Sequence, residues 1–294
     1  MGENMARKKS GAVKSTATKI QNLLIQIFLI FVMMLTIYPI LYVILGSFKG
    51  NQELLLGGIN LIPRKFIISN YTEAWTLGNF GVYTVNSIVL SISIMVLTLV
   101  ITSMAGYCLA RKKFWGSSVI YGLLLIFMFI NVGSVSLRPL FELSVKVGMN
   151  KSLLSVILIS TGTAQAANIF LIRGFMNSIP KELDEAAKID GCTFFQIYCR
   201  IILPVLKPIL ATVGLLSFRS GWNEYILPLV FTMSNEKLRP LTVGVVQLRN
   251  AGDGAAAWNI MFAGSTIAIV PIIVIYMFFS KHFMEGMTSG AVKG

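Results

Sequence analysis

The chain has 294 residues, of which 55% are hydrophobic and only 13% are charged, and its mean hydropathy is +0.75. Because soluble domains carry about 25% charged residues, this composition excludes an ordinary soluble protein and predicts an integral membrane protein. Basic loops facing anionic lipid account for the net charge of +13, so we expect membrane lipid and no nucleic acid among the partners.

The first part of the chain combines a basic tail with a long apolar segment. Residues 1–19 are basic and too polar to bury a core. The apolar segment from Leu23 to Gly46 exceeds a signal peptide in length, so we interpret it as an uncleaved first span that bends or ends at Pro39. This span and a turn-rich extracytoplasmic loop occupy residues 20–82.

Five further apolar segments follow in residues 83–282, and a short tail occupies residues 283–294. The expected spans are Val85 to Leu109, Val119 to Leu137, Leu153 to Leu171, a fifth from Val205 to Phe231 that polar residues interrupt, and Met261 to Phe279. Segments of about 20 residues, rising about 1.5 Å per residue, match the hydrocarbon thickness of a bilayer. The sequence therefore predicts an all-α, polytopic membrane protein with six transmembrane helices.

The basic residues also predict the orientation. The tail and the Arg111–Lys113 triplet fall on the same side as the loop of residues 173–204, and charges on the opposite side are more widely spread. Because cytoplasmic loops carry excess Lys and Arg, both termini and the loop of residues 173–204 are expected in the cytoplasm.

Residue types that perform chemistry are sparse. Cys108, Cys192 and Cys199 have no paired spacing, and His282 has no cluster of ligands beside it. We therefore expect no disulfide framework, no metal site and no catalytic residue. The chain also lacks a Gly-x-x-x-x-Gly-Lys-Ser/Thr phosphate loop, so energy for any transport must come from a partner.

Within the loop of residues 173–204, the stretch from Glu185 to Pro204 is charge-dense and long enough to fold on its own. A proline is tolerated in a first helical turn and acidic residues favour it, so a short helix is expected to begin near Pro180. Gly191 is the residue most easily placed in a left-handed cap and should end it. Ala186 and Ala187 would offer a shallow surface to a partner.

This loop resembles the cytoplasmic loop of ABC importer permeases, whose pattern is Glu-Ala-Ala, three residues, Gly, nine residues, Ile, one residue, Leu-Pro. The pattern is met by Glu185, Ala186, Ala187, Gly191, Ile201, Leu203 and Pro204, and Asp190, on the same helix just before Gly191, is expected to couple with them. The resemblance implies that the loop is a coupling helix that docks in a cleft of a cytoplasmic ATPase, and a match with fixed spacing over twenty residues is stronger than a short motif.

Two further sets of polar residues lie within apolar spans and could line a pathway or gate. The first is Thr163, Gln165 and Asn168 in the fourth span, and the second is Arg219, Trp222, Asn223, Glu224 and Tyr225 in the fifth. Polar groups are costly against lipid, but hydrogen bonding between helices or anchoring of a helix end at the membrane boundary would also explain them. The run from Trp222 to Tyr225 also resembles a signature of carbohydrate importer permeases.

The resemblance implies the type I ABC importer permease fold in a bacterial cell membrane. This chain would form half of a pathway for a sugar or oligosaccharide delivered by an extracytoplasmic solute-binding protein. A homologous permease subunit would form the other half, and two ATPase subunits would bind ATP and Mg, so this chain needs no cofactor. The alternatives are an ion-coupled secondary transporter, for which Glu224 is the sole candidate acid, and a membrane anchor without a passage.

Overall fold

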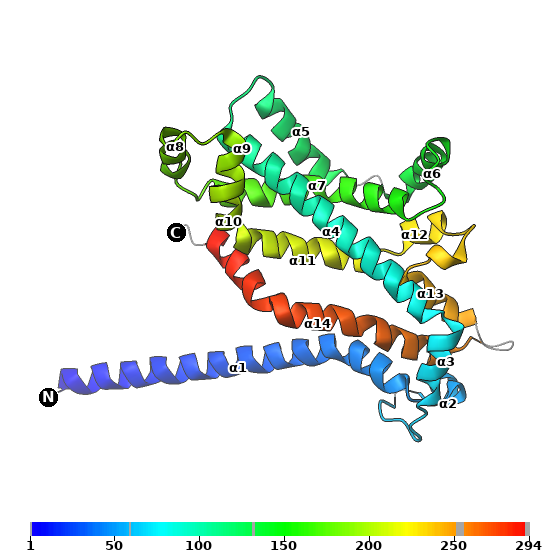
Figure 1. Cartoon of the computed structure of the whole chain (residues 1–294). Coiled ribbons are helices and arrows are strands. Elements are labelled where there is room, and N and C mark those ends of the chain that lie inside the picture. Colours follow the sequence, from blue (N-terminus) through cyan, green and yellow to red (C-terminus); the bar gives the residue numbers. More distant parts are fainter. Residues whose placement is uncertain (1, 59, 131–132, 251–255, 292–294) are drawn as a thin grey trace.

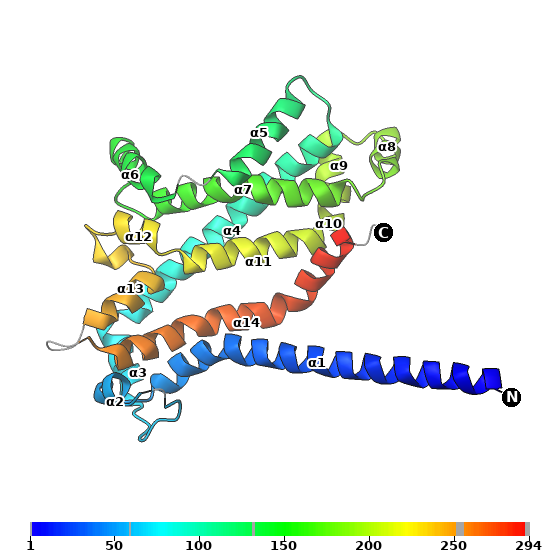
Figure 2. The ribbon, with the colours of Figure 1, turned by 180° about the vertical axis from the view of Figure 1, so that it is seen from behind.

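The structure is a computed structural model, and it describes residues 2–58, 60–130, 133–250 and 256–291. Every regular element in these ranges is a helix, as the sequence predicted. In Figures 1 and 2 the long helices lie roughly along one direction, in the order α7, α11, α14 and α1, and α4 crosses beside α7 and α11. The last three residues of the expected tail lie outside the described ranges.

Helix α1, Gly2–Gly46, begins within the expected basic tail and continues through Pro39. Pro39 is therefore not where this helix ends. The part from Thr18 to Gly46 is long and apolar enough to cross a membrane, and none of its most apolar window is buried against the rest of the chain. Contacts with α14, Trp258–Ala291, occur where Tyr42 meets Phe262 with ring centroids 5.9 Å apart.

The end of the bundle that holds α2, Asn51–Leu56, and α3, Ser69–Leu77, is joined to α14 by asparagine side chains. Asn70 is buried, and its amide donates to the backbone carbonyl of Ser47 at 2.7 Å. The amide of Asn259 in α14 donates to the Asn70 side-chain oxygen at 2.8 Å. A satisfied buried network of this kind fixes the turn after α1 against the start of α14.

Much of the core lies between α4, Phe80–Arg111, α7, Leu154–Met176, and α11, Lys207–Asn223. A further cluster packs α4 and α11 on α13, Leu241–Gln247, and α14. A glycine permits α4 and α7 to approach closely, because a Cβ at Gly106 would lie 2.7 Å from Ile172. Bulky side chains of all three helices are buried between them. This packing makes α4 the central element of the fold.

The N-terminal end of α4 is bonded to the loop before α13, Leu241–Gln247. The amide of Asn86 donates to the carbonyls of Lys237 at 2.7 Å and Arg239 at 3.0 Å. The hydroxyl of Ser87 accepts from the backbone N–H of Leu241 at 2.8 Å. The far end of α4 reaches the loop of residues 173–204, so this one helix joins both ends of the bundle (Figure 1).

The described residues contain three helices that are long and apolar enough to cross a membrane, or up to five when each of two bent pairs is counted as one span. The expected third span is shorter than predicted: α5, Ser117–Phe129, has only 13 residues, because the backbone becomes extended at Ile130. A helix of that length rises about 20 Å, less than the roughly 30 Å of a hydrocarbon core.

The other helices are short. They are α6 at Leu137–Lys146, α8 at Glu182–Ile189, α9 at Phe194–Ile197, α10 at Leu203–Val205, and α12 at Ile226–Phe231. Helices α8 to α10 lie at the end of the bundle where α1 begins, whereas α2, α3, α12 and α13 lie at the other end (Figures 1 and 2).

Candidate functional site: a clamped loop and an interrupted helix

The short helix expected near Pro180 is α8, which begins at Glu182. Its end at Gly191 is confirmed, because Gly191 has a φ of +81°. The backbone N–H of Gly191 donates to the Lys188 carbonyl at 3.0 Å, and that of Cys192 donates to the Ala187 carbonyl at 2.9 Å. These bonds satisfy carbonyls that the end of a helix would otherwise leave free, as in a Schellman-type cap.

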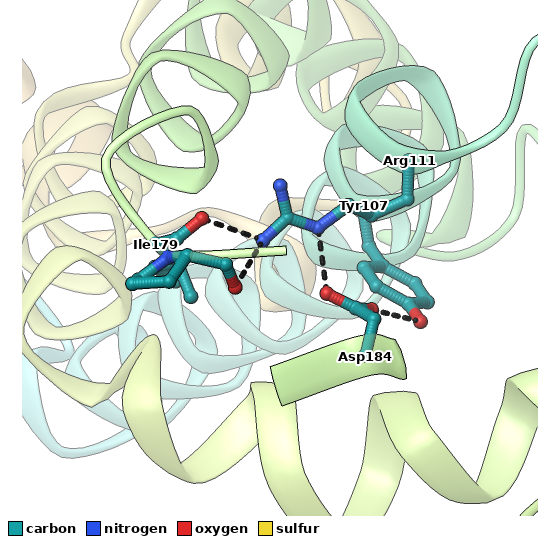
Figure 3. Close-up of polar contacts among 5 residues, drawn as sticks. Tyr107, Arg111, Ile179 and Asp184 are labelled. Carbon is teal, nitrogen blue, oxygen red and sulfur yellow. Dashed lines mark hydrogen bonds and ion pairs between the residues drawn. The ribbon is translucent and has the colours of Figure 1, made fainter. Parts of the chain in front are cut away.

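A buried ion pair holds α8 against the end of α4 (Figure 3). The guanidinium Nε of Arg111 lies 2.8 Å from Asp184 Oδ2, and each side chain is only 7% exposed. The hydroxyl of Tyr107 donates to the other carboxylate oxygen at 3.0 Å. A second guanidinium nitrogen donates to the Ile179 carbonyl at 2.8 Å, so the Arg111 side chain holds both α8 and the turn before it.

Aromatic contacts extend this attachment to α9. Phe194 stacks on Tyr107 with ring centroids 4.6 Å apart, and the Lys112 ammonium lies 4.3 Å from the Phe194 ring. The hydroxyls of Ser103 and Tyr198 lie 2.7 Å apart in a buried hydrogen bond. We call the six residues Ser103, Tyr107, Arg111, Asp184, Phe194 and Tyr198 the α4 clamp. The clamp therefore joins α8 and the segment that begins with α9 to the end of α4.

The connection from α9 to α11 is helical but sharply bent. Thr193 and Gln196 form a reciprocal capping box at the start of α9. A π-helical turn, Tyr198–Ile202, leads into α10, and the axis then bends by 80° between Phe194–Val205 and Lys207–Asn223. Pro204 therefore lies just before the fifth span, as expected, although α11 begins at Lys207 rather than Val205.

The face of α8 turned away from the clamp is exposed. Glu185, Ala186 and Asp190 are exposed, and Ile189 is 87% exposed despite its apolar side chain. Ala187 was expected to share the docking surface with Ala186, but it is only 3% exposed and packs in the core beside α9. The alanine pair is divided because adjacent positions of a helix point in directions about 100° apart.

Most residues near the end of the expected motif pack inside the loop and are not available to a partner. Ile201 and Leu203 are half-buried and pack on the same apolar cluster as Ala187, whereas Pro204 is exposed. The motif thus contains an exposed part on α8 and a packed part around α10.

The sequence analysis missed the clamp residues Tyr107, Arg111 and Asp184. Asp184 stands directly before Glu185 and was interpreted only as a first-turn acid, and Arg111 only as a topology signal. The available signal was a single acidic residue in register with buried positions of α8, three residues before Ala187. An acid on the apolar face of a helix indicates a buried partner.

The polar residues of the fourth span lie on different sides of α7. Thr163 is exposed, Gln165 is half-buried and Asn168 is buried. The amide nitrogen of Gln165 donates to the Thr161 carbonyl at 2.7 Å, while its side-chain oxygen is buried and has no hydrogen-bond partner among the described residues. The helix axis bends by 50° between Leu154–Thr163 and Gln165–Met176, so the polar set coincides with a break in the helix.

Four of the five residues singled out in the fifth span line one pocket of about 540 Å³, where α11 ends and α12 begins. The lining consists of Leu216, Arg219, Ser220, Asn223, Glu224, Tyr225 and Ile226. The helix is interrupted at Glu224, whose Oε1 accepts from the backbone N–H of Leu227 at 3.3 Å. This bond satisfies one backbone N–H in the first turn of α12, whose N-cap residue is Tyr225.

Trp222, the fifth residue, is absent from the pocket and only 2% exposed. Its ring lies 5.8 Å from that of Phe218 in a stacked pair, and its indole N–H donates to the Ala268 carbonyl at 3.1 Å. The expectation that Trp222 lines a pathway or gate is therefore wrong, because its position on α11 points into the core against α14.

Trp222→Phe should lower the thermal stability of the purified protein while leaving the KM for uptake unchanged. The variant keeps an apolar ring but loses one hydrogen bond, which corresponds to about 0.5–1.5 kcal/mol. A thermal unfolding scan in detergent, measured beside uptake, checks this result. A raised KM at unchanged stability would contradict this prediction and show that Trp222 does line the pathway.

The bundle contains apolar helices long enough to cross a membrane and an exposed loop attached to α4, as expected of a polytopic membrane subunit. Among the described residues no cluster of His, Cys, Asp or Glu could hold a metal ion. Residues 77–289 match the family of binding-protein-dependent transport system inner membrane components. The chain belongs to this family, whose members are the non-catalytic permease components and leave ATP to a partner ATPase.

Several curated relatives span nearly the whole chain. The arabinooligosaccharides transport system permease protein AraQ of Halalkalibacterium halodurans is 34% identical over 285 residues, covering 96% of this chain and 100% of that protein. The melibiose/raffinose/stachyose import permease protein MelC of Bacillus subtilis is 32% identical, covering 80% and 84%. A crystal structure of a bacterial ABC transporter involved in the import of the acidic polysaccharide alginate matches with a TM-score of 0.78 at 23% identity. The match covers 90% of this chain and 97% of that chain, and shows the same fold.

Proposed function

We propose that this chain forms half of the translocation pathway of an ATP-driven importer for a sugar or oligosaccharide. In this proposal a homologous permease forms the other half, two ATPase subunits bind the cytoplasmic face, and an extracytoplasmic solute-binding protein delivers the substrate. The names of relatives such as the arabinooligosaccharides permease AraQ and the melibiose/raffinose/stachyose permease MelC support a carbohydrate substrate. Both termini lie in the cytoplasm of a bacterial cell in this proposal.

Six crossings fit this arrangement, with α5 as a short one. Helix α4 ends beside α8, and α7 also reaches this end, since Gly106 of α4 packs on Ile172 of α7. The chain between α4 and α7 must therefore return to the opposite end through α5, before α6. The proposed parts are the tail at 1–19, the first span and outer loop at 20–82, the membrane domain at 83–282 with the loop at 173–204, and the tail at 283–294.

The observation that carries the proposal is the two-sided character of α8. One side is fixed through Asp184 to α4, and the other exposes Ala186 and Ile189. We propose that the exposed side docks in an ATPase cleft, with Glu185 and Asp190 at its edge. Closure of two ATPase subunits would then move α8 as a rigid body, and the clamp would pass this movement to α4.

The two alanines of α8 provide a matched test in the assembled complex. Ala186→Cys should give a crosslinked product with the ATPase subunit, because Ala186 is exposed, whereas Ala187→Cys should give little, because Ala187 is buried. Crosslinking in membranes that contain all subunits, followed by mass spectrometry, measures the products. Absence of an ATPase adduct from Ala186→Cys, or equal yields from both positions, would contradict the docking proposal.

Nothing in the geometry favours the ion-coupled alternative. Glu224 is its candidate acid, but one carboxylate oxygen accepts from the backbone N–H of Leu227 and its backbone carbonyl accepts from the Thr242 hydroxyl at 2.7 Å. A role in bonding the first turn of α12 accounts for this acid without proton or cation binding.

A further inference from the structure

The pocket where α11 meets α12 is lined along one face of α11. Leu216, Arg219, Ser220 and Asn223 line it from α11. Their spacing of three, one and three residues places them on one face, because residues three and four apart are neighbours on a helix surface. Phe218 and Trp222 lie on the opposite, buried face. Arg219, Ser220 and Asn223 thus form an exposed polar stripe that lines the pocket from α11, beside the half-buried Leu216.

Arg219 is the unusual member of this stripe. It is exposed, it lies in a helix that belongs to a candidate membrane span, and it has no hydrogen-bond or ion-pair acceptor among the described residues. A guanidinium has five N–H donors and remains charged in proteins. Charged groups at membrane depth face a water-filled path or a partner, so Arg219 needs an acceptor from outside this chain.

The acid in the same pocket does not supply that acceptor. Glu224 makes no ion pair with Arg219 and is held by its bonds to Leu227 and Thr242. The pocket thus offers donors from Arg219, a mixed amide from Asn223 and a carboxylate from Glu224, with formal charges that cancel. Leu216, Tyr225 and Ile226 add apolar walls.

This combination matches the surface of a neutral sugar. A sugar ring presents hydroxyls that both donate and accept hydrogen bonds, together with C–H faces that pack on apolar or aromatic side chains. The pocket volume of about 540 Å³ lies within the roughly 300–1,000 Å³ of small-molecule sites. An acidic sugar would bring its carboxylate near Glu224 as well as Arg219, and because the formal charges of the pocket cancel, the added charge gains no net attraction.

We propose that this pocket is a contact site for a neutral sugar unit on the translocation pathway, with Arg219 and Asn223 binding hydroxyls and Tyr225 packing on the ring. The inference rests on the proposed function and deepens it by assigning substrate contacts to this subunit. Glu224 acts as a positioning residue, because its bond to the first turn of α12 places Tyr225 at the pocket wall.

The first experiment is protection from labelling in the complete complex with its ATPase and binding protein. In a background with serine at 108, 192 and 199, Asn223→Cys is labelled with a membrane-impermeant maleimide in the presence of maltotriose, raffinose, arabinotriose or a galacturonic acid trimer. At least one neutral trisaccharide should slow the labelling, and the acidic trimer should not. Protection by none of them, or by the acidic trimer alone, would overturn the proposal.

The second experiment measures uptake of the protecting sugar in proteoliposomes. Arg219→Met should raise KM about 10- to 100-fold, since hydrogen bonds to charged groups correspond to about 1.5–3 kcal/mol. Arg138→Gln is the control and should leave KM unchanged, because Arg138 is exposed outside the pocket and pairs with Glu142. If Arg219→Met instead separates the two permease subunits and KM is unaltered, Arg219 is a counter-charge for the partner and the sugar assignment is wrong.

Failure of this inference and failure of the proposed function give different results. Loss of the Ala186→Cys crosslink to the ATPase contradicts the importer mechanism whatever the sugars do. A normal crosslink combined with unprotected labelling at position 223 contradicts only the sugar pocket.

Discussion

Arg111→Met is expected to reduce uptake more than tenfold while the chain still inserts into the membrane and still binds the ATPase. The substitution leaves the Asp184 carboxylate buried without its cation, and removing one partner of a buried ion pair costs about 3–5 kcal/mol. Helix α8 would retain its exposed face and the Tyr107 hydrogen bond but lose the ion pair that attaches it to α4. ATP hydrolysis would then continue without transport, and parallel assays of uptake and phosphate release in proteoliposomes measure this uncoupling.

A double variant separates loss of the ion pair from loss of folding. Arg111→Met combined with Asp184→Leu removes both charges, which is far less costly than leaving one buried alone. Stability should therefore recover, whereas coupling should remain low because the polar attachment to Ile179 is also lost. The control Arg138→Gln breaks an exposed pair that contributes at most about 1 kcal/mol, and it should transport normally. Full coupling in the Arg111→Met variant would show that the clamp does not transmit movement.

Gly191→Val is expected to lower uptake about tenfold, whereas Gly191→Asn should retain most of it. No atom lies within 4 Å of a Cβ built at this position, so space is not limiting. The φ of +81° is the constraint, because a β-branched residue is strained in the left-handed region and Asn tolerates it. In the Val variant the cap of α8 would open and the exposed face would lose its orientation.

The crosslink from Ala186→Cys reports on this geometry in both backgrounds. Its yield should fall with Gly191→Val and persist with Gly191→Asn, and uptake should follow the same order. Equal uptake in the two variants would mean that the left-handed cap is dispensable for coupling.

Local chemistry made part of the fold and site predictable. Gly191 ends α8 because its conformation is a property of the residue itself, and α7 and α14 follow from long apolar segments. The end of α5 at Phe129 was not predictable from hydropathy, which continues through Ile130 while the backbone turns away.

The direction in which each side chain points was the main feature that the sequence did not predict. Trp222 and Asn223 are neighbours in sequence, but one packs on α14 and the other lines a pocket. The pairing of Arg111 with Asp184 joins residues 73 positions apart, and composition and spacing carry no information about such a contact. Alanines 186 and 187 were separated by the same effect, since helix phase decides which one meets the core.

The bonds at the two ends of α4 have a mechanical consequence. Its 32 residues, at about 1.5 Å each, make a rod about 48 Å long, with Arg111 gripped at one tip and Asn86 tied near the other. A tilt imposed at the Arg111 end of α4 would displace the Asn86 end directly, without rearrangement of the helix between them. We therefore expect the segment around Lys237 and Arg239 to move when the partner ATPase binds nucleotide.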